Sequence, residues 1–243
     1  MWGIVWLIVP TYNEAENIEP LVEAALAQLE LAAPGSHRIL IVDDSSPDGT
    51  GELADGLAAR HEAVEVLHRG AREGLGPAYL AGFARAIEGG AGAICQMDAD
   101  FSHDPADLPR LLAAISAGAD VALGSRYVAG GGVEDWGLLR RVVSRTGCTY
   151  ARWVLGLDVR DLTGGFKCFR REVLEAIHLE TVRSHGYCFQ VEMTQRALLR
   201  GFSVREVPIV FRDRRHGHSK ISPRIAVEAF VVLPQLRWRS GLS

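Results

Sequence analysis

The sequence contains little cysteine, no excess of basic residues and no long hydrophobic run. It has 243 residues, and its four cysteines, none of them in a CxxC pair, are Cys95, Cys148, Cys168 and Cys188. This spacing argues against a zinc site or a disulfide framework and favours buried, reduced thiols in a cytosolic protein. A formal net charge of -4 argues against nucleic acid as the main partner. No apolar run reaches the length of about 20 residues that spans a bilayer, so we expect any contact with a membrane to be peripheral.

The sequence instead has strand-like and helix-like segments in alternation. With 48% hydrophobic residues, the chain is apolar enough to bury a large core. Short apolar, strand-like runs separated by longer helical patterns lie at 3–10, 37–44, 63–69, 92–100 and 120–127. This alternation predicts an α/β fold with a Rossmann-like, mostly parallel sheet covered by helices on both faces. Ligands of such sheets bind beyond the carboxyl ends of the strands, and polar clusters follow the first, second, fourth and fifth runs.

The pattern changes after residue 128. We expect a cationic helical segment at 138–157, a helix at 187–201 and a strand at 202–211, before a last apolar helix. The sequence therefore predicts one α/β domain over 1–220 and a carboxyl-terminal helical elaboration over 221–243.

Two aspartates, Asp98 and Asp100, follow the fourth strand-like run. On an extended backbone, residues two apart project from the same face, so both carboxylates can share one ligand. Mg²⁺ and Mn²⁺ prefer such oxygens and take one or two protein carboxylates, with water and phosphate oxygens completing the shell. The alternative interpretation is that Asp98 ends the strand while Asp104 caps the helix that begins at Pro105.

A second acidic pair, Asp43 and Asp44, closes the second strand-like run. The following "SPDGT" is typical of a turn that caps a helix. An acid at this place in a nucleotide-binding α/β unit accepts hydrogen bonds from a ribose or base, which a capping role alone does not explain. Gly74 and Gly76 match no phosphate-binding fingerprint and indicate the first turn of a helix.

The basic residues form two groups. Arg126 comes directly after the fifth strand-like run, whereas Arg140 and Ser144 are four residues apart and share one helix face. Guanidinium groups with a hydroxyl make a phosphate clamp, although a solvated basic face explains Arg141 and Arg145 equally well. The basic loop "RDRRHGHSK" at 212–220 is either solvated or folds over phosphates.

Six motifs in this order resemble one enzyme family. They are "PTYNEAENI", "VDDSSPDGT", "MDADFSHDP", "LGSRYVAGGGVEDWG", "RDLTGGFKCFRREVL" and "HGYCFQVEM". Together, from about residue 4 to residue 220, they resemble the dolichol- or polyprenol-phosphate mannose synthases of glycosyltransferase family 2, whose fold is called GT-A. Some relatives append transmembrane helices at the carboxyl terminus, where this chain has one apolar segment.

The resemblance implies roles for individual residues. The guanosine of GDP-mannose is expected at Pro10, Tyr12, Glu14, Val42 and Asp44. The ribose, the diphosphate and the metal ion, Mg²⁺ or Mn²⁺, are expected at Asp98, Ala99 and Asp100. The acceptor phosphate is expected at Arg126, Arg140 and Ser144, and the loop that closes over the donor carries Arg214 and Lys220. Where some relatives have a metal-binding glutamine, this chain has Ser102.

The implied reaction is transfer of mannose from GDP-mannose to a polyprenyl (dolichyl-type) phosphate, with inversion at the sugar carbon. Asp100, Arg126 and Arg140 are the expected catalytic residues. Two other functions stay open at this point: a UDP-glucose-dependent polyprenyl-phosphate glucosyltransferase and a non-catalytic nucleotide-sugar-binding module. The sequence indicates no protein partner.

The expected location is the cytoplasmic face of a membrane, because the acceptor is a lipid. Apolar residues between Ile225 and Leu236, followed by Arg237, Trp238 and Arg239, suit a helix lying in the headgroup region. A final helix docked on the sheet, or a dimer contact, is the alternative.

Overall fold

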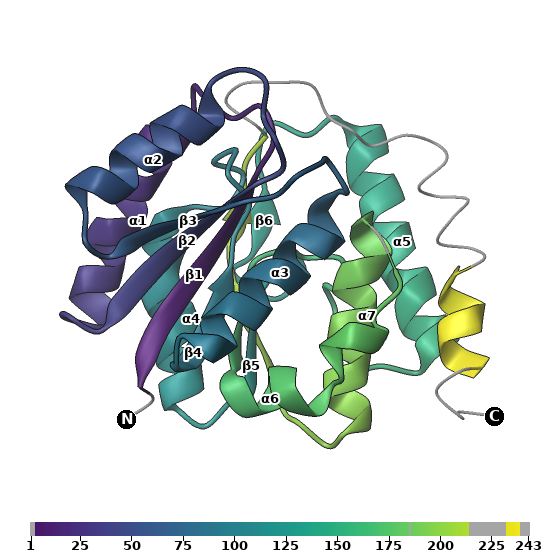
Figure 1. Ribbon diagram of the computed structural model, residues 1–243. Coiled ribbons are helices and arrows are strands. Elements are labelled where there is room, and N and C mark those ends of the chain that lie inside the picture. Colours follow the sequence, from purple (N-terminus) through teal and green to yellow (C-terminus); the bar gives the residue numbers. More distant parts are fainter. Residues whose placement is uncertain (1–2, 185, 214–231, 239–243) are drawn as a thin grey trace.

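The computed structural model describes residues 3–184, 186–213 and 232–238 (Figure 1). Within this part the chain forms a seven-stranded sheet in the order β3-β2-β1-β4-β7-β5-β8. Its strands are β1 (Ile4–Thr11), β2 (His37–Asp43), β3 (Val64–His68), β4 (Ala91–Gln96), β5 (Val121–Ser125), β7 (Lys167–Arg170) and β8 (Val204–Pro208). Two short strands, β6 (Gly132–Val133) and β9 (Val210–Phe211), pair beside it.

Helices connect the strands. They are α1 (Ile18–Ala32), α2 (Thr50–Arg60), α3 (Leu75–Glu88), η1 (Pro105–Asp107), α4 (Leu108–Ser116), α5 (Leu138–Leu155), α6 (Arg171–Ala176), η2 (Leu179–Thr181) and α7 (Gly186–Leu199). Each of the six expected strands and each helix expected before residue 202 is present, with ends shifted by a few residues, and the strand expected at 202–211 is divided into β8 and β9. The expected α/β fold with a mostly parallel sheet is therefore confirmed.

One strand runs against the others. β7 lies between β4 and β5 and is antiparallel to both, whereas the remaining strand pairs of the sheet are parallel. Our sequence analysis assigned no strand to these residues, because a four-residue strand that contains Lys167 has neither the length nor the apolar pattern of a buried strand.

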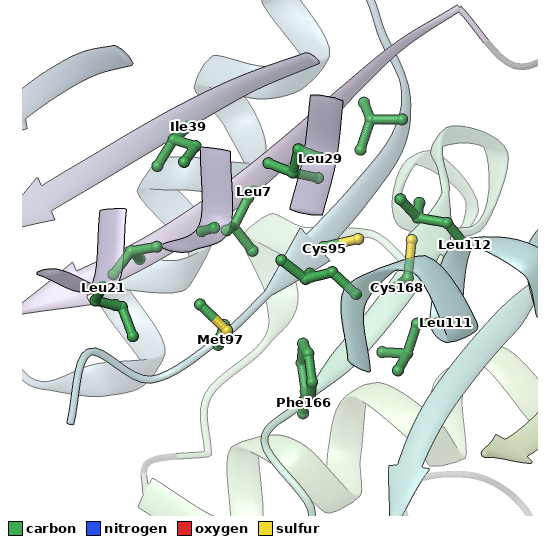
Figure 2. Close-up of a cluster of buried hydrophobic side chains, with 14 of the residues drawn as sticks. Leu7, Leu21, Leu29, Ile39, Cys95, Met97, Leu111, Leu112, Phe166 and Cys168 are labelled. Atoms are coloured by element: carbon green, nitrogen blue, oxygen red, sulfur yellow. The ribbon is translucent and has the colours of Figure 1, made fainter. Parts of the chain in front are cut away.

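Two layers of helices bury the two faces of the sheet. On β1, Val5, Leu7 and Val9 face a core formed with α1, α2 and α4 (Figure 2). The alternate residues Trp6 and Ile8 face a second core formed with α3, α6 and α7. Strand side chains alternate between faces, so the nearly continuous apolar sequence of β1 follows from burial on both sides.

A third apolar cluster packs α5 against Leu123 of β5. It joins Ala151, Val154 and Leu155 of α5 to Leu233 and Leu236 of a helical turn at 232–238. The four cysteines are free and buried, as the sequence analysis predicted. Among the described helices, none is long and apolar enough to cross a membrane.

Candidate active site

The loops after β1, β2 and β4 meet at the carboxyl edge of the sheet, as expected for parallel strands. Each holds a non-glycine residue in the left-handed region, at Asn13 (φ 58°), Ser45 (φ 56°) and Phe101 (φ 59°). Such backbone costs about 1–3 kcal/mol per residue, and it tends to cluster at functional sites. The strained loops therefore mark the same edge that the polar motifs predicted.

The predicted nucleoside residues lie on adjacent strands and their loops. Pro10 and Val42 are buried and directly paired between β1 and β2. Tyr12 is half-buried, and the guanidinium carbon of Arg72 lies 4.0 Å from the centre of its ring. Glu14 accepts a hydrogen bond from the side-chain amide of Asn17 at 2.8 Å. The structure thus brings these residues to one end of the sheet.

Asp43 and Asp44 have different partners. Asp43 accepts hydrogen bonds from Thr11 and from both the backbone and side chain of Ser46, so it holds the "SSPDGT" turn. Asp44 is nearly buried and binds the guanidinium of Arg69 at 2.5 Å. It also accepts the backbone N–H of Gly74, the residue before α3, at 3.1 Å. Only Asp43 therefore has the turn-forming role, and the glycine marks a helix start, as the sequence predicted.

The acids after β4 lie in a crowded, partly buried loop. The Tyr79 hydroxyl donates a hydrogen bond to Asp98 at 3.0 Å, and Asp100 accepts the backbone N–H of Ser102 at 3.1 Å. Burial, together with the negative charge of Asp98, raises the pKa of Tyr79 well above its ordinary value. Tyr79 therefore stays protonated and keeps donating to Asp98. Ala99 between the acids packs into the core.

His103 supports this loop, although the sequence analysis did not select it. It is buried, and its Nδ1 accepts the backbone N–H of Asp98 at 3.3 Å. Burial lowers its pKa, outweighing the nearby charges of Asp98 and Asp100, so the ring is neutral at pH 7. The residue lies inside the quoted motif "MDADFSHDP", but a lone histidine carries no local signal that distinguishes support from catalysis.

The residues around these acids fit a divalent cation. The Ser102 hydroxyl is buried and has no hydrogen-bond partner among the described residues, and the residue's backbone N–H already binds Asp100. A methyl group on Gly165 would lie 3.5 Å from the Asp98 carboxylate, so glycine leaves room beside it. No group of three or more His, Cys, Asp or Glu side chains suited to a metal occurs in the described residues. Two carboxylates and one hydroxyl are the donor set expected for an ion that also binds phosphate oxygens.

Arg126 forms a buried ion pair with Asp161. Its guanidinium donates to the carboxylate at 2.7 and 2.6 Å, and its backbone N–H donates to the same group at 2.9 Å. Burial disfavours the charge of Arg126, but Asp161 more than offsets this, so the pKa of Arg126 is raised. Burial likewise raises the pKa of Asp161, yet the guanidinium brings it below its ordinary value. Arg126 thus lies directly after β5, as the sequence predicted. Its charge is neutralised by Asp161, which the sequence analysis did not predict as its partner.

Arg140 and Ser144 lie on α5, one turn apart. Arg140 binds both oxygens of the Asp213 carboxylate at 2.9 Å, and its guanidinium carbon lies 4.1 Å from the centre of the Trp136 ring. Its Nε is buried without a hydrogen-bond partner among the described residues. Ser144 accepts a hydrogen bond from the hydroxyl of Tyr127 at 2.7 Å. The guanidinium of Arg140 is thus bound to a carboxylate, and its expected contact with the acceptor phosphate stays a prediction.

Aromatic rings connect the acids to the arginines. The His103 ring lies 5.3 Å from Phe211, and Phe211 lies 5.3 Å from Trp136. The guanidinium carbon of Arg126 is 5.6 Å from the Trp136 ring, on which Arg140 also stacks. One continuous wall thus runs from the aspartate loop to α5. Our sequence analysis missed Trp136 and Phe211, because contact between distant aromatic residues leaves no local pattern.

A polar cluster lies in the core behind the aspartate loop. Lys167 is fully buried, and its ammonium group donates to the backbone and side-chain oxygens of Gln190 at 2.7 and 3.0 Å. Gln96 donates to the Gln190 side chain at 2.6 Å and to the carbonyl of Gly165 at 2.7 Å. Burial lowers the pKa of Lys167 to about 7. This cluster fixes the Gly165 backbone next to Asp98.

The other candidates lie elsewhere. Arg214 and Lys220 fall outside the described residues, as does most of the predicted carboxyl-terminal helix. Two further buried acids are held in ion pairs, Glu192 with Arg196 and Asp161 with Arg126.

Comparisons with known proteins identify the family of the chain. The family model described as "Glycosyl transferase family 2" matches residues 6–177, and the chain belongs to this family. It is 52% identical over 217 residues to polyprenol monophosphomannose synthase of Mycolicibacterium smegmatis, covering 89% of this chain and 80% of the relative. It is 47% identical over 227 residues to undecaprenyl-phosphate mannosyltransferase of Micrococcus luteus, covering 93% and 91%.

A solved structure shares the fold. The mannosyltransferase PcManGT of Pyrobaculum calidifontis, in complex with GDP-Man and Mn²⁺, superposes with a TM-score of 0.58 at 15% identity. The match covers 100% of this chain and 76% of that one. At this identity the likeness shows the fold alone.

Proposed function

We propose that the protein transfers mannose from GDP-mannose to a polyprenyl (dolichyl-type) phosphate, with inversion at the anomeric carbon. The observation that supports the proposal is the aromatic wall, which joins the Asp98–Asp100 loop, our candidate for the metal and the diphosphate, to Arg140, our candidate for the acceptor phosphate. The names of the two relatives support the sugar and the lipid acceptor.

On the donor side, we assign the nucleoside to the edge formed by β1 and β2. Pro10, Val42 and the Tyr12 ring supply the apolar surface, while Glu14 and Asp44 supply oxygens for N–H or O–H donors. Support for GDP-mannose as donor comes from the complex of the structural neighbour with GDP-Man.

The diphosphate is assigned to the loop after β4. Asp98 and Asp100 would hold Mg²⁺ or Mn²⁺ there, with Ser102 as the third protein oxygen. When bound, the ion neutralises charge on the diphosphate leaving group. Tyr79 and His103 orient the Asp98 side chain and backbone, and Gly165 leaves space for the ligand.

On the acceptor side, we assign the lipid phosphate to Arg140 and Ser144. A phosphate takes the place of the Asp213 carboxylate on the guanidinium, and the Ser144 hydroxyl, held by Tyr127, adds a donor. Arg126, which we also expected at this phosphate, has its guanidinium bound by Asp161, and we propose that it supports the acceptor site by fixing the loop that carries Tyr127. A phosphomonoester has lost its first proton and, with a second pKa near 6, most of the second at pH 7, so it attacks without a protein base.

A lipid acceptor supports a location at a membrane. We propose a catalytic domain over 1–220, peripheral on the cytoplasmic face of a membrane, with residues 221–243 as an appended element.

A chelator experiment tests this assignment of the site. The purified protein is incubated with radiolabelled GDP-mannose, a short-chain polyprenyl phosphate and Mn²⁺, and label in the organic phase is counted. We expect label in the lipid for the wild type and loss of this signal in excess EDTA. Full transfer in EDTA would contradict the metal assignment, and absence of labelled lipid under all conditions would contradict the function.

A further inference from the structure

The outer face of α5 exposes a stripe of large apolar side chains. Leu138 and Leu139 are 79% and 78% exposed, Val142 and Val143 are 52% and 48% exposed, and Trp153 is 79% exposed. With 3.6 residues per turn, these positions fall on one side of the helix, opposite the buried residues Cys148, Ala151 and Leu155. We call the five exposed residues the α5 stripe.

The size of the stripe sets it apart from ordinary surface residues. Single exposed apolar side chains are common, as at Leu31 on α1, which is 75% exposed. The α5 stripe instead has four such side chains in the first six residues of the helix and Trp153 about three turns further along the same side.

The charges around the stripe indicate its partner. Within α5 the charged residues are four arginines, with no Asp or Glu, although the whole chain carries a net charge of -4. Arg141 and Arg145 are exposed, and neither forms an ion pair with a described residue. Aliphatic and tryptophan side chains beside unpaired arginines are the composition of helices that lie in the headgroup region of anionic membranes.

We infer that the α5 stripe docks on an anionic lipid bilayer, with Arg141 and Arg145 on the lipid headgroups. The inference rests on the proposed function and extends it, because Arg140 belongs to the same helix. A helix with its side chains is about 10–12 Å across, so a phosphate held by Arg140 lies within one helix width of the membrane surface. The lipid acceptor reaches the site while its hydrocarbon tail stays in the bilayer.

Vesicle flotation tests the inference. The full chain is mixed with vesicles of phosphatidylcholine alone or with phosphatidylglycerol, and the bound fraction is measured. The variant is Leu139→Ser with Val142→Ser, which leaves the charge unchanged, and the control is Leu31→Ser. Circular dichroism and GDP binding verify that each variant is folded. We expect the wild type and the control to bind anionic vesicles and the double variant to bind roughly tenfold more weakly, since it loses several buried carbons.

Activity on a water-soluble short-chain polyprenyl phosphate, measured without vesicles, separates the two proposals. The double variant should keep this activity, because the stripe faces away from Arg140. Equal vesicle binding by the double variant and the wild type would overturn the inference, as would a wild type that binds no vesicles. Self-association of the wild type that the double variant loses, without vesicle binding by either, would identify a second copy of the chain as the occupant. Vesicle binding without transfer of mannose to any polyprenyl phosphate would refute the proposed function but not the inference that the α5 stripe docks on a membrane.

Discussion

Removing the negative charge of Asp161 should destabilise the protein strongly, because this carboxylate neutralises the buried Arg126. The pair is bidentate, at 2.7 and 2.6 Å, and Asp161 also accepts the backbone N–H of Arg126 at 2.9 Å. In Asp161→Asn the amide keeps part of the shape but leaves a buried guanidinium without a counter-charge. Breaking a buried pair from one side costs about 3–5 kcal/mol. We therefore expect the urea midpoint to fall by about 1 to 2 M.

Two controls separate charge burial from other effects. Asp158→Asn removes the partner of Arg152 at a fully exposed position, and it should cost less than about 1 kcal/mol. The double variant Arg126→Met with Asp161→Leu removes both charges and should recover most of the lost stability. Asp161→Asn within about 1 kcal/mol of the wild type, or a double variant no better than the single one, would refute this reasoning.

The pH dependence of protein stability is a second test of the Arg126–Asp161 pair. The native pKa of Asp161 lies below its ordinary value of 3.8, so the native carboxylate holds its proton more weakly than the unfolded one. The stability that this group contributes is therefore present above about pH 4 and is lost as the pH falls through the native pKa. Asp161→Asn should abolish that part of the acid dependence in urea unfolding followed between pH 2 and 6.

Other perturbations have distinct expected outcomes. Arg140→Ala should raise the KM for a soluble polyprenyl phosphate roughly 10- to 100-fold, since one charge-assisted contact is lost, while GDP binding in calorimetry stays normal. The control Arg141→Ala should change neither quantity. An equal loss of GDP affinity in Arg140→Ala would indicate that Arg140 binds the donor and not the acceptor. Ser102→Ala should weaken Mn²⁺-dependent GDP binding and leave unfolding nearly unchanged, and unaltered metal dependence would exclude this hydroxyl as a ligand. Because burial lowers the pKa of Lys167 to about 7, its stability penalty is full below pH 7 and diminishes as the pH rises toward the unfolded value of 10.5. Between pH 7 and 8.5 the wild type should therefore gain roughly 2 kcal/mol relative to Lys167→Met, and parallel pH curves for the two proteins would contradict a buried charge.

Much of the fold could be predicted because its signals are local. The strands β1 to β5 and the helices between them have apolar runs, turns and spacings that a short window contains, and parallel strand ends place Asp44 and Asp98 on one edge. β7 could not be predicted in this way. Its position is fixed by pairing with β4 and β5, and its lysine is compensated by Gln190 on a distant helix.

In the candidate site, too, the residues with local signals could be predicted and those that depend on long-range contacts could not. The acids after β4 and the arginines after β5 and on α5 were predicted from the residues and from the family resemblance. Asp161 lies 35 residues from its partner Arg126, and Trp136 contacts both Arg126 and Arg140 only in the folded chain. The sequence predicted α5 as a cationic helix, but only the structure shows which of its sides faces outward. Long-range partners and exposed faces are properties of the packing and leave no local pattern.

The central claim is most directly tested by a competition between donors. The protein is incubated with equal amounts of GDP-mannose and UDP-glucose, Mn²⁺ and a short-chain polyprenyl phosphate, and the lipid product is identified by sugar analysis and its anomeric configuration by NMR. The account predicts polyprenyl-phosphate mannose, with the anomeric configuration opposite to that of the donor and with GDP released in equal amount. Polyprenyl-phosphate glucose, a product with retained configuration, or release of free sugar without a lipid product would contradict it.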